Sequence, residues 1–116
     1  MTNTNLVGII TVGGLPQFIA GASLVDGTAT EVKYTPDAGT AESVGKRFDG
    51  KKMSRVELQV ADGSIASLVE ILDEKGAVIW SSGGRERSGE QLLDFDSGPL
   101  DIILRLGYKL RVTTAD

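Results

Sequence analysis

Residues Ser64–Ser82, SIASLVEILDEKGAVIWSS, carry the clearest structural signal in the chain. Two apolar runs, Ile65–Leu72 and Ala77–Trp80, flank Asp73-Glu74-Lys75-Gly76, whose final glycine can adopt a positive φ. This pattern predicts a β-hairpin. The first arm is apolar on both faces of a strand, because only a serine and a glutamate interrupt it. Such a strand needs cover on both sides, from its own core and from a second sheet, a loop or another subunit.

Short strand-like runs separated by turn signals recur along the rest of the chain. The most regular alternation is in Ser54–Ala61, where Val56, Leu58 and Val60 point one way and charged or polar residues point the other. Glycine, proline and Asp-Gly pairs punctuate the runs. The other predicted strands are Leu6–Val12, Gln17–Val25, Thr30–Tyr34, Gln91–Phe95, Leu100–Leu106 and Lys109–Thr114.

These runs predict an all-β fold. The sequence contains no long amphipathic helix, so we expect a single-domain antiparallel β-sandwich over residues 1–116, of the jelly-roll type with about eight strands. Residues 1–5 are predicted to form a flexible N-terminal tail and residues 36–52 a long loop. A chain of 116 residues can bury roughly two thirds of its unfolded surface in one core.

Composition removes several classes of function. The chain has neither cysteine nor histidine, so it lacks the usual catalytic triads, thiolate metal sites and histidine ligands, and we expect no enzyme, no metal and no cofactor. A net charge of −4 disfavours nucleic acid and anionic membranes as partners. The first residues do not resemble a signal peptide, and no apolar run reaches membrane-spanning length.

Three motifs have both a functional and an ordinary interpretation. The Gly83–Gly89 loop could hold a phosphate, but no helix follows it, which favours an ordinary loop. Asp94 and Asp96 could bind calcium, but too few further oxygen ligands accompany them, which favours a turn at a strand end. Lys46, Arg47, Lys51 and Lys52 surround Phe48 and could bind an acidic partner or form a solvated loop.

The C-terminal half, Ser54–Asp116, resembles small phage structural proteins whose jelly-roll domains decorate heads or form parts of tails and fibres. The likeness lies in VEILDEKGAVIWSS and in LLDFDSGPLDIILRLGYKLRVTTAD. The resemblance implies a non-enzymatic virion protein, often a trimer, that binds an assembled capsid or tail surface. It supplies no catalytic motif.

We therefore expect a capsid decoration or cement protein of a bacteriophage virion, assembled in the host cytoplasm. It would self-associate, with a homotrimer favoured, and dock on a major capsid or other virion protein. The predicted oligomer interface consists of Leu68, Leu72, Trp80 and Leu104. The residues predicted to bind the partner are Thr2, Asn3, Asn5, Lys46, Arg47, Phe48, Lys51, Lys52, Arg85 and Arg87.

Two other functions remain open at this stage. The chain could be a carbohydrate- or receptor-binding module of a tail or fibre, although it has few aromatic residues. It could also be a hydrolase that depends on carboxylates, which requires two acidic side chains about 5–10 Å apart in a cleft.

Overall fold

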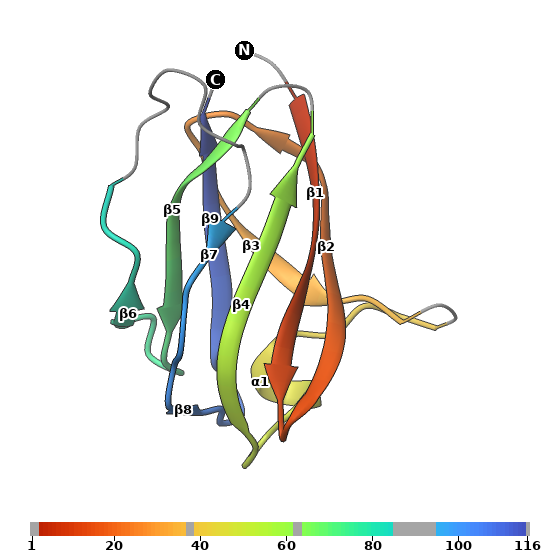
Figure 1. The fold of residues 1–116 in the computed structure, drawn as a ribbon, viewed down its shortest axis with the longest axis vertical. Helices are drawn as coiled ribbons and strands as arrows, with labels where there is room; N and C mark the ends of the chain where they lie inside the picture. The colour runs from red at the N-terminus through yellow and green to blue at the C-terminus, as the bar shows by residue number, and fades with distance from the viewer. Residues whose placement is uncertain (1–2, 37–38, 62–63, 85–94, 116) are drawn as a thin grey trace.

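The computed structural model describes residues 3–36, 39–61, 64–84 and 95–115. Within those ranges it contains nine β-strands and one short helix (Figure 1). In chain order they are β1 (Asn3–Val12), β2 (Leu15–Val25), β3 (Ala29–Tyr34), α1 (Val44–Arg47), β4 (Lys52–Val60), β5 (Ile65–Leu72), β6 (Val78–Ser81), β7 (Phe95–Asp96), β8 (Ile102–Ile103) and β9 (Lys109–Ala115).

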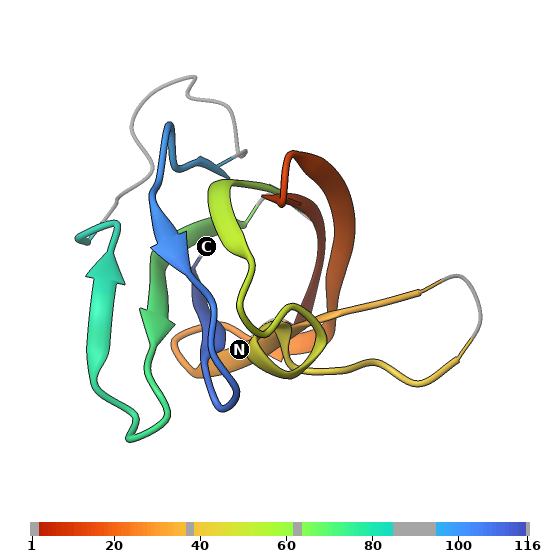
Figure 2. The same ribbon diagram turned by 90° about the horizontal axis from the view of Figure 1, so that it is seen from below.

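The strands form one antiparallel sheet in the order β6-β5-β9-β3-β2-β1-β4-β7, and β8 also pairs with β4. The sheet curls strongly into a half-barrel, as Figure 2 shows. The predicted all-β antiparallel fold is therefore confirmed, but the pairing does not give the two separate sheets of a jelly-roll sandwich. Strand β3 is the reason, because it pairs with β2 through Tyr34 and Lys33 and with β9 through residues 29–32.

Strand β1 has two features that favour this curl. A Cβ added to Gly8 would lie 2.7 Å from Leu58 Cδ2 and closer still to the Glu57 carbonyl oxygen, so only glycine allows the neighbouring strand to approach this closely. Register shifts also interrupt the pairing of β1 with β2 and with β4. Such irregularities increase the local twist of a strand pair.

The predicted hairpin between β5 and β6 is confirmed. The Asp73 carboxylate accepts hydrogen bonds from the backbone N–H groups of Lys75 and Ala77, at 2.8 and 2.9 Å, and Gly76 has a φ of 83°. Strand β5 lies between β6 and β9 in the sheet. Its inward side chains, Val69 and Ile71, are fully buried in the core, which explains one of its two apolar faces.

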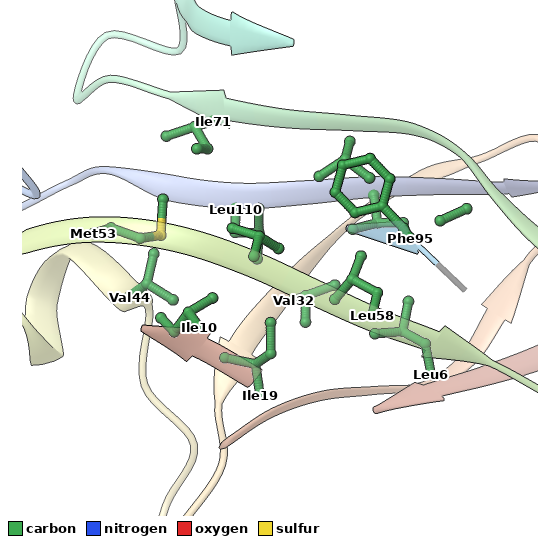
Figure 3. Close-up of a cluster of buried hydrophobic side chains, with 14 of the residues drawn as sticks. Leu6, Ile10, Ile19, Val32, Val44, Met53, Leu58, Ile71, Phe95 and Leu110 are labelled. Atoms are coloured by element: carbon green, nitrogen blue, oxygen red, sulfur yellow. The ribbon is translucent and has the colours of Figure 1, made fainter. Parts of the chain in front are cut away.

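The inner face of the curled sheet encloses a hydrophobic core, and Figure 3 shows side chains from several strands and α1 pointing into it. The alternation predicted within β4 is confirmed, since Val56, Leu58 and Val60 are buried and Glu57 and Gln59 are exposed. Fully burying a leucine or isoleucine side chain stabilises the fold by about 1.5–3 kcal/mol. The largest fully buried side chains are Leu6, Ile10, Ile19, Met53, Ile71, Leu104 and Leu110.

A buried polar contact ties the end of β2 to β9. The Thr114 hydroxyl donates a hydrogen bond of 2.8 Å to the Asp26 carboxylate, and the Gly27 N–H donates to the Thr114 carbonyl oxygen, also at 2.8 Å. Asp26 is 8% exposed, and its other carboxylate oxygen is buried with no hydrogen-bond partner among the described residues. The Thr114 hydroxyl is therefore the side-chain donor that compensates for burying this carboxylate.

Residues Leu100–Leu106 do not form the predicted continuous strand. Only Ile102–Ile103 pairs with β4 as β8. The backbone N–H groups of Leu100 and Leu104 bond instead to single carbonyl oxygens of Ser54 and Lys51. Part of this segment covers the core, where Leu104 is fully buried and Leu100 and Ile102 pack against it, whereas Ile103 and Leu106 are exposed.

The predicted long loop 36–52 contains α1 and reaches the first residue of β4. Helix α1 packs tightly on the turn before β9. A Cβ added to Gly45 would lie 2.6 Å from both the backbone nitrogen and oxygen of Tyr108, and closer still to the Arg105 carbonyl oxygen. Glycine is therefore required where the helix meets this turn.

Candidate functional site

The outer face of β2, β1 and β4, which lie side by side (Figure 1), carries an open groove of about 670 Å³. Side chains that alternate with the core positions point outward here. Two of them are unusually exposed for their size, since Phe18 is 63% and Val7 57% exposed. The residues that line the groove are Val7, Gly8, Ile9, Phe18, Glu57, Leu58, Gln59, Phe95 and Asp96.

The strand register places four of these side chains in one row across the sheet. Phe18 is opposite Ile9, Ile9 is opposite Glu57, and Glu57 is opposite Asp96. Neighbouring strands lie about 4.8 Å apart, so the row is about 14 Å long. Its first half is apolar and its second half is acidic. The groove can therefore hold a ligand with an apolar end and a cationic end.

The acidic half is partly neutralised by Arg55. Its Nε donates a hydrogen bond of 3.0 Å to Asp96 Oδ1, a second guanidinium nitrogen contacts Asp96 Oδ2, and Glu57 lies 3.7 Å from Arg55 Nε. The hydrogen bond from Arg55, helped by the Gly98 N–H, lowers the pKa of Asp96 below its usual value. Among the described residues of the rim, two carboxylates face one guanidinium, so their net charge is negative.

A second hollow of about 340 Å³ adjoins the groove at β7 and shares Phe95 and Asp96 with it. Its wall is formed by Trp80 and serine side chains. The Trp80 ring contacts Phe95 edge-on, with centroids 6.4 Å apart and planes at 69°. Strands β6 and β7 are the two ends of the sheet, so this contact bridges the opening of the half-barrel.

The four basic residues of the predicted cluster are exposed, but the aromatic residue between them is not. Lys46 and Arg47 are exposed on α1, but Phe48 is 3% exposed and belongs to the core. The Arg47 guanidinium lies 5.0 Å from the centroid of the Tyr34 ring, and Lys52 lies 3.7 Å from an Asp101 carboxylate oxygen. Lys51 is exposed. The structure therefore corrects the assignment of Phe48 as a surface contact.

Two of the four residues of the predicted oligomer interface are buried within the single chain. Leu104 is fully buried and Leu72 is 6% exposed. Leu68 and Trp80 are half-buried, and Trp80 packs against the core. Leu104 is thus a core residue, because its side chain helps to close the half-barrel, and it does not present a surface to a second subunit.

Strand β1 begins at Asn3, inside the segment predicted to be a flexible tail. Its first residues pair with the end of β2. The Asn5 side chain is committed to this pairing, since its Oδ1 accepts a hydrogen bond of 2.7 Å from the Ser23 N–H. The other predicted contacts Thr2, Arg85 and Arg87 lie outside the described residues.

Sequence reasoning missed Val7, Phe18, Glu57 and Gln59 as site residues. A signal was present, because Leu6–Val12 is apolar on both faces, just as β5 is. A strand that is apolar on both faces exposes a row of apolar side chains when one of its faces is open to solvent. The sequence pattern does not contain the sheet order, so it could not show that β1, and not β5, has such an exposed apolar face.

In the described ranges, no group of three or more acidic side chains is placed to hold a metal ion. The same part of the chain has no helix long and apolar enough to cross a membrane. Comparison with protein-family models, with characterised proteins and with solved structures gives no match.

Proposed function

We propose that the chain is a non-enzymatic structural protein that works by self-association and by docking on an assembled protein shell. The observation that supports this proposal is the exposure of Phe18 and Val7 on one open sheet face beside the groove. Contiguous apolar surface of this kind commonly marks a protein interaction site. The polar residues Glu57 and Gln59 along one side resemble the rim of an interface.

The shell partner in this proposal comes from the resemblance of Ser54–Asp116 to phage structural proteins. In that role the chain is a capsid decoration or cement protein that assembles as a homotrimer on a virion surface. An all-β fold with an outward-facing apolar groove suits such a role, because a partner can cover the groove without any rearrangement of the core.

The test is the mass of the protein in solution, measured by light scattering after size exclusion over a range of concentrations. We expect the wild type to form a defined oligomer and Phe18→Asp to be monomeric with an unchanged circular dichroism spectrum. Leu15→Asp is the matched control, because Leu15 is 62% exposed but does not line the groove. A wild type that stays monomeric throughout refutes self-association.

Docking on a shell is tested by cosedimentation with purified phage heads that lack a decoration protein. Wild-type protein is expected to sediment with the heads and Phe18→Asp to remain in the supernatant. Equal sedimentation of the two proteins would remove the groove from the docking surface.

Carbohydrate binding is a second candidate, favoured by the exposed Phe18 ring in the same groove as Glu57 and Gln59. An aromatic face with nearby hydrogen-bonding groups can hold a sugar ring. A glycan array probed with wild type and with Phe18→Ala tests this function. A specific glycan signal lost in the variant would establish it, and a blank array would remove it.

Hydrolysis is less well supported by the same groove. Glu57 and Asp96 are opposite each other in the register, which brings two acids together as a hydrolase needs. However, Arg55 occupies the Asp96 carboxylate and lowers its pKa. A general acid needs the opposite shift, toward a protonated carboxyl at neutral pH.

A further inference from the structure

We infer that the groove of one copy receives the turn Arg105–Leu106 of a second copy. This inference rests on the proposed self-association and names the two surfaces that meet. Leu106 is 64% exposed, and Arg105 beside it is also exposed. This turn has an apolar side chain next to a cation, which is the combination that the row of Phe18, Ile9, Glu57 and Asp96 can accept.

The charges of the two surfaces are complementary. Arg105 has no ion-pair partner within the described part of the chain, so its charge is available to a neighbour. In the groove, Glu57 is the less engaged carboxylate, since it lies 3.7 Å from Arg55 while Asp96 makes the closer contacts. We therefore pair Arg105 with Glu57, and Leu106 with Phe18 and Val7.

The turn is held rigidly, which lowers the entropy cost of binding. The Tyr108 N–H donates to the Arg105 carbonyl oxygen at 2.9 Å, and the Leu106 N–H donates to Asp49 Oδ1 at 3.2 Å. Gly107 has a φ of 94°, and a Cβ there would meet Glu74 at 2.7 Å. The turn therefore presents Leu106 and Arg105 in a fixed position before any contact forms.

The groove and the turn are on different parts of the molecule. The turn precedes β9, which starts at the lower end of the molecule in Figure 1, whereas the groove is lined by residues of β1, β2, β4 and β7. The contact therefore joins unlike surfaces of two copies. Repetition of such a contact gives a ring when its rotation closes, and a trimer is one of the rings it can form.

The inference is tested by charge exchange, with sedimentation velocity as the measurement. Arg105→Glu and Glu57→Lys each place like charges in contact, and each is expected to raise the dissociation constant at least about tenfold. The double variant Glu57→Lys with Arg105→Glu restores opposite charges and is expected to recover assembly. Lys75→Glu is the matched control, since Lys75 is exposed on the β5–β6 turn.

The outcomes separate this inference from the proposed function. A wild type that assembles while both single variants also assemble normally overturns the inference and leaves self-association intact. Loss of assembly in the single variants without recovery in the double variant also overturns it, provided that circular dichroism shows folded protein. Leu106→Ala supplies an independent check without any change of charge, and it is expected to weaken assembly as well. A monomeric wild type refutes both proposals together.

Discussion

Replacement of Gly45 by alanine tests whether α1 packs against the turn before β9 as closely as the structure shows. The added Cβ would lie 2.6 Å from the backbone nitrogen and oxygen of Tyr108, about 0.8 Å less than the 3.4 Å at which ordinary contact begins. The obstructing atoms belong to backbone, so they cannot rotate away as the end of a side chain could. Either α1 or the turn must move.

The cost has two parts. Overpacking in a well-packed interior costs about 1–3 kcal/mol. The shift also disturbs the hydrogen bond of 3.1 Å from the Gly45 N–H to the Tyr108 carbonyl oxygen, and a bond of this kind is worth about 0.5–1.5 kcal/mol. We therefore expect Gly45→Ala to lower the free energy of unfolding by about 1.5–4.5 kcal/mol.

The assay is urea denaturation followed by far-ultraviolet circular dichroism and by the fluorescence of Trp80, the single tryptophan. Gly84→Ala is the control, because a Cβ there meets no atom of the described residues within 4 Å and its φ is not positive. It is expected to change stability by less than about 0.5 kcal/mol. A Gly45→Ala protein as stable as the control would refute the close packing of α1.

Three further predictions follow from other contacts. Leu104→Ala should lower the free energy of unfolding, measured by urea denaturation, by about 2–5 kcal/mol because it opens a cavity. Leu15→Ala, at a residue 62% exposed, should lower it by less than about 0.5 kcal/mol, and equal effects would contradict the assignment of Leu104 to the core. Thr114→Val should lower the free energy of unfolding by about 1–3 kcal/mol, because it leaves the buried Asp26 carboxylate without its hydroxyl donor. Thr113→Val, at a half-buried neighbour, should have a smaller effect, and similar unfolding midpoints for the two variants would argue against this role for the Thr114 hydroxyl. Arg55→Gln should raise the pKa of Asp96 toward its ordinary value of 3.8 in a carboxyl NMR titration, and an unchanged titration would exclude Arg55 as the cause of the lowered pKa. Because the pKa of Asp96 is lowered in the folded state, the ion pair stabilises the fold at pH values above the ordinary carboxyl pKa and loses this effect as the pH falls through the lowered pKa.

Local patterns predicted the local structure well. The Asp73–Gly76 link formed the expected hairpin, because both its hydrogen bonds and the positive φ of Gly76 depend on nearby residues. The alternation in β4 was read correctly for the same reason. The continuous strand predicted for Leu100–Leu106 was wrong, because a loop that packs partly on the core can contain as many apolar residues as a strand.

The curl of the sheet and the groove could not be predicted in this way. Closure into a half-barrel depends on β3 pairing with both β2 and β9, and on the approach of Gly8 to Leu58. These contacts join residues far apart in sequence, so no short window contains them. The groove depends on contacts of the same long-range kind, because the register of β2, β1, β4 and β7 brings Phe18, Glu57 and Asp96 into one row.

The position of β9 has a consequence for the order of folding during synthesis. It is the last strand along the described chain, yet it lies between β3 and β5 and pairs with both. A ribosome-bound chain that ends before Lys109 has β3 and β5 without the strand that joins them. We therefore expect little stable structure in that half of the sheet until β9 has left the exit tunnel, after which one late insertion completes it.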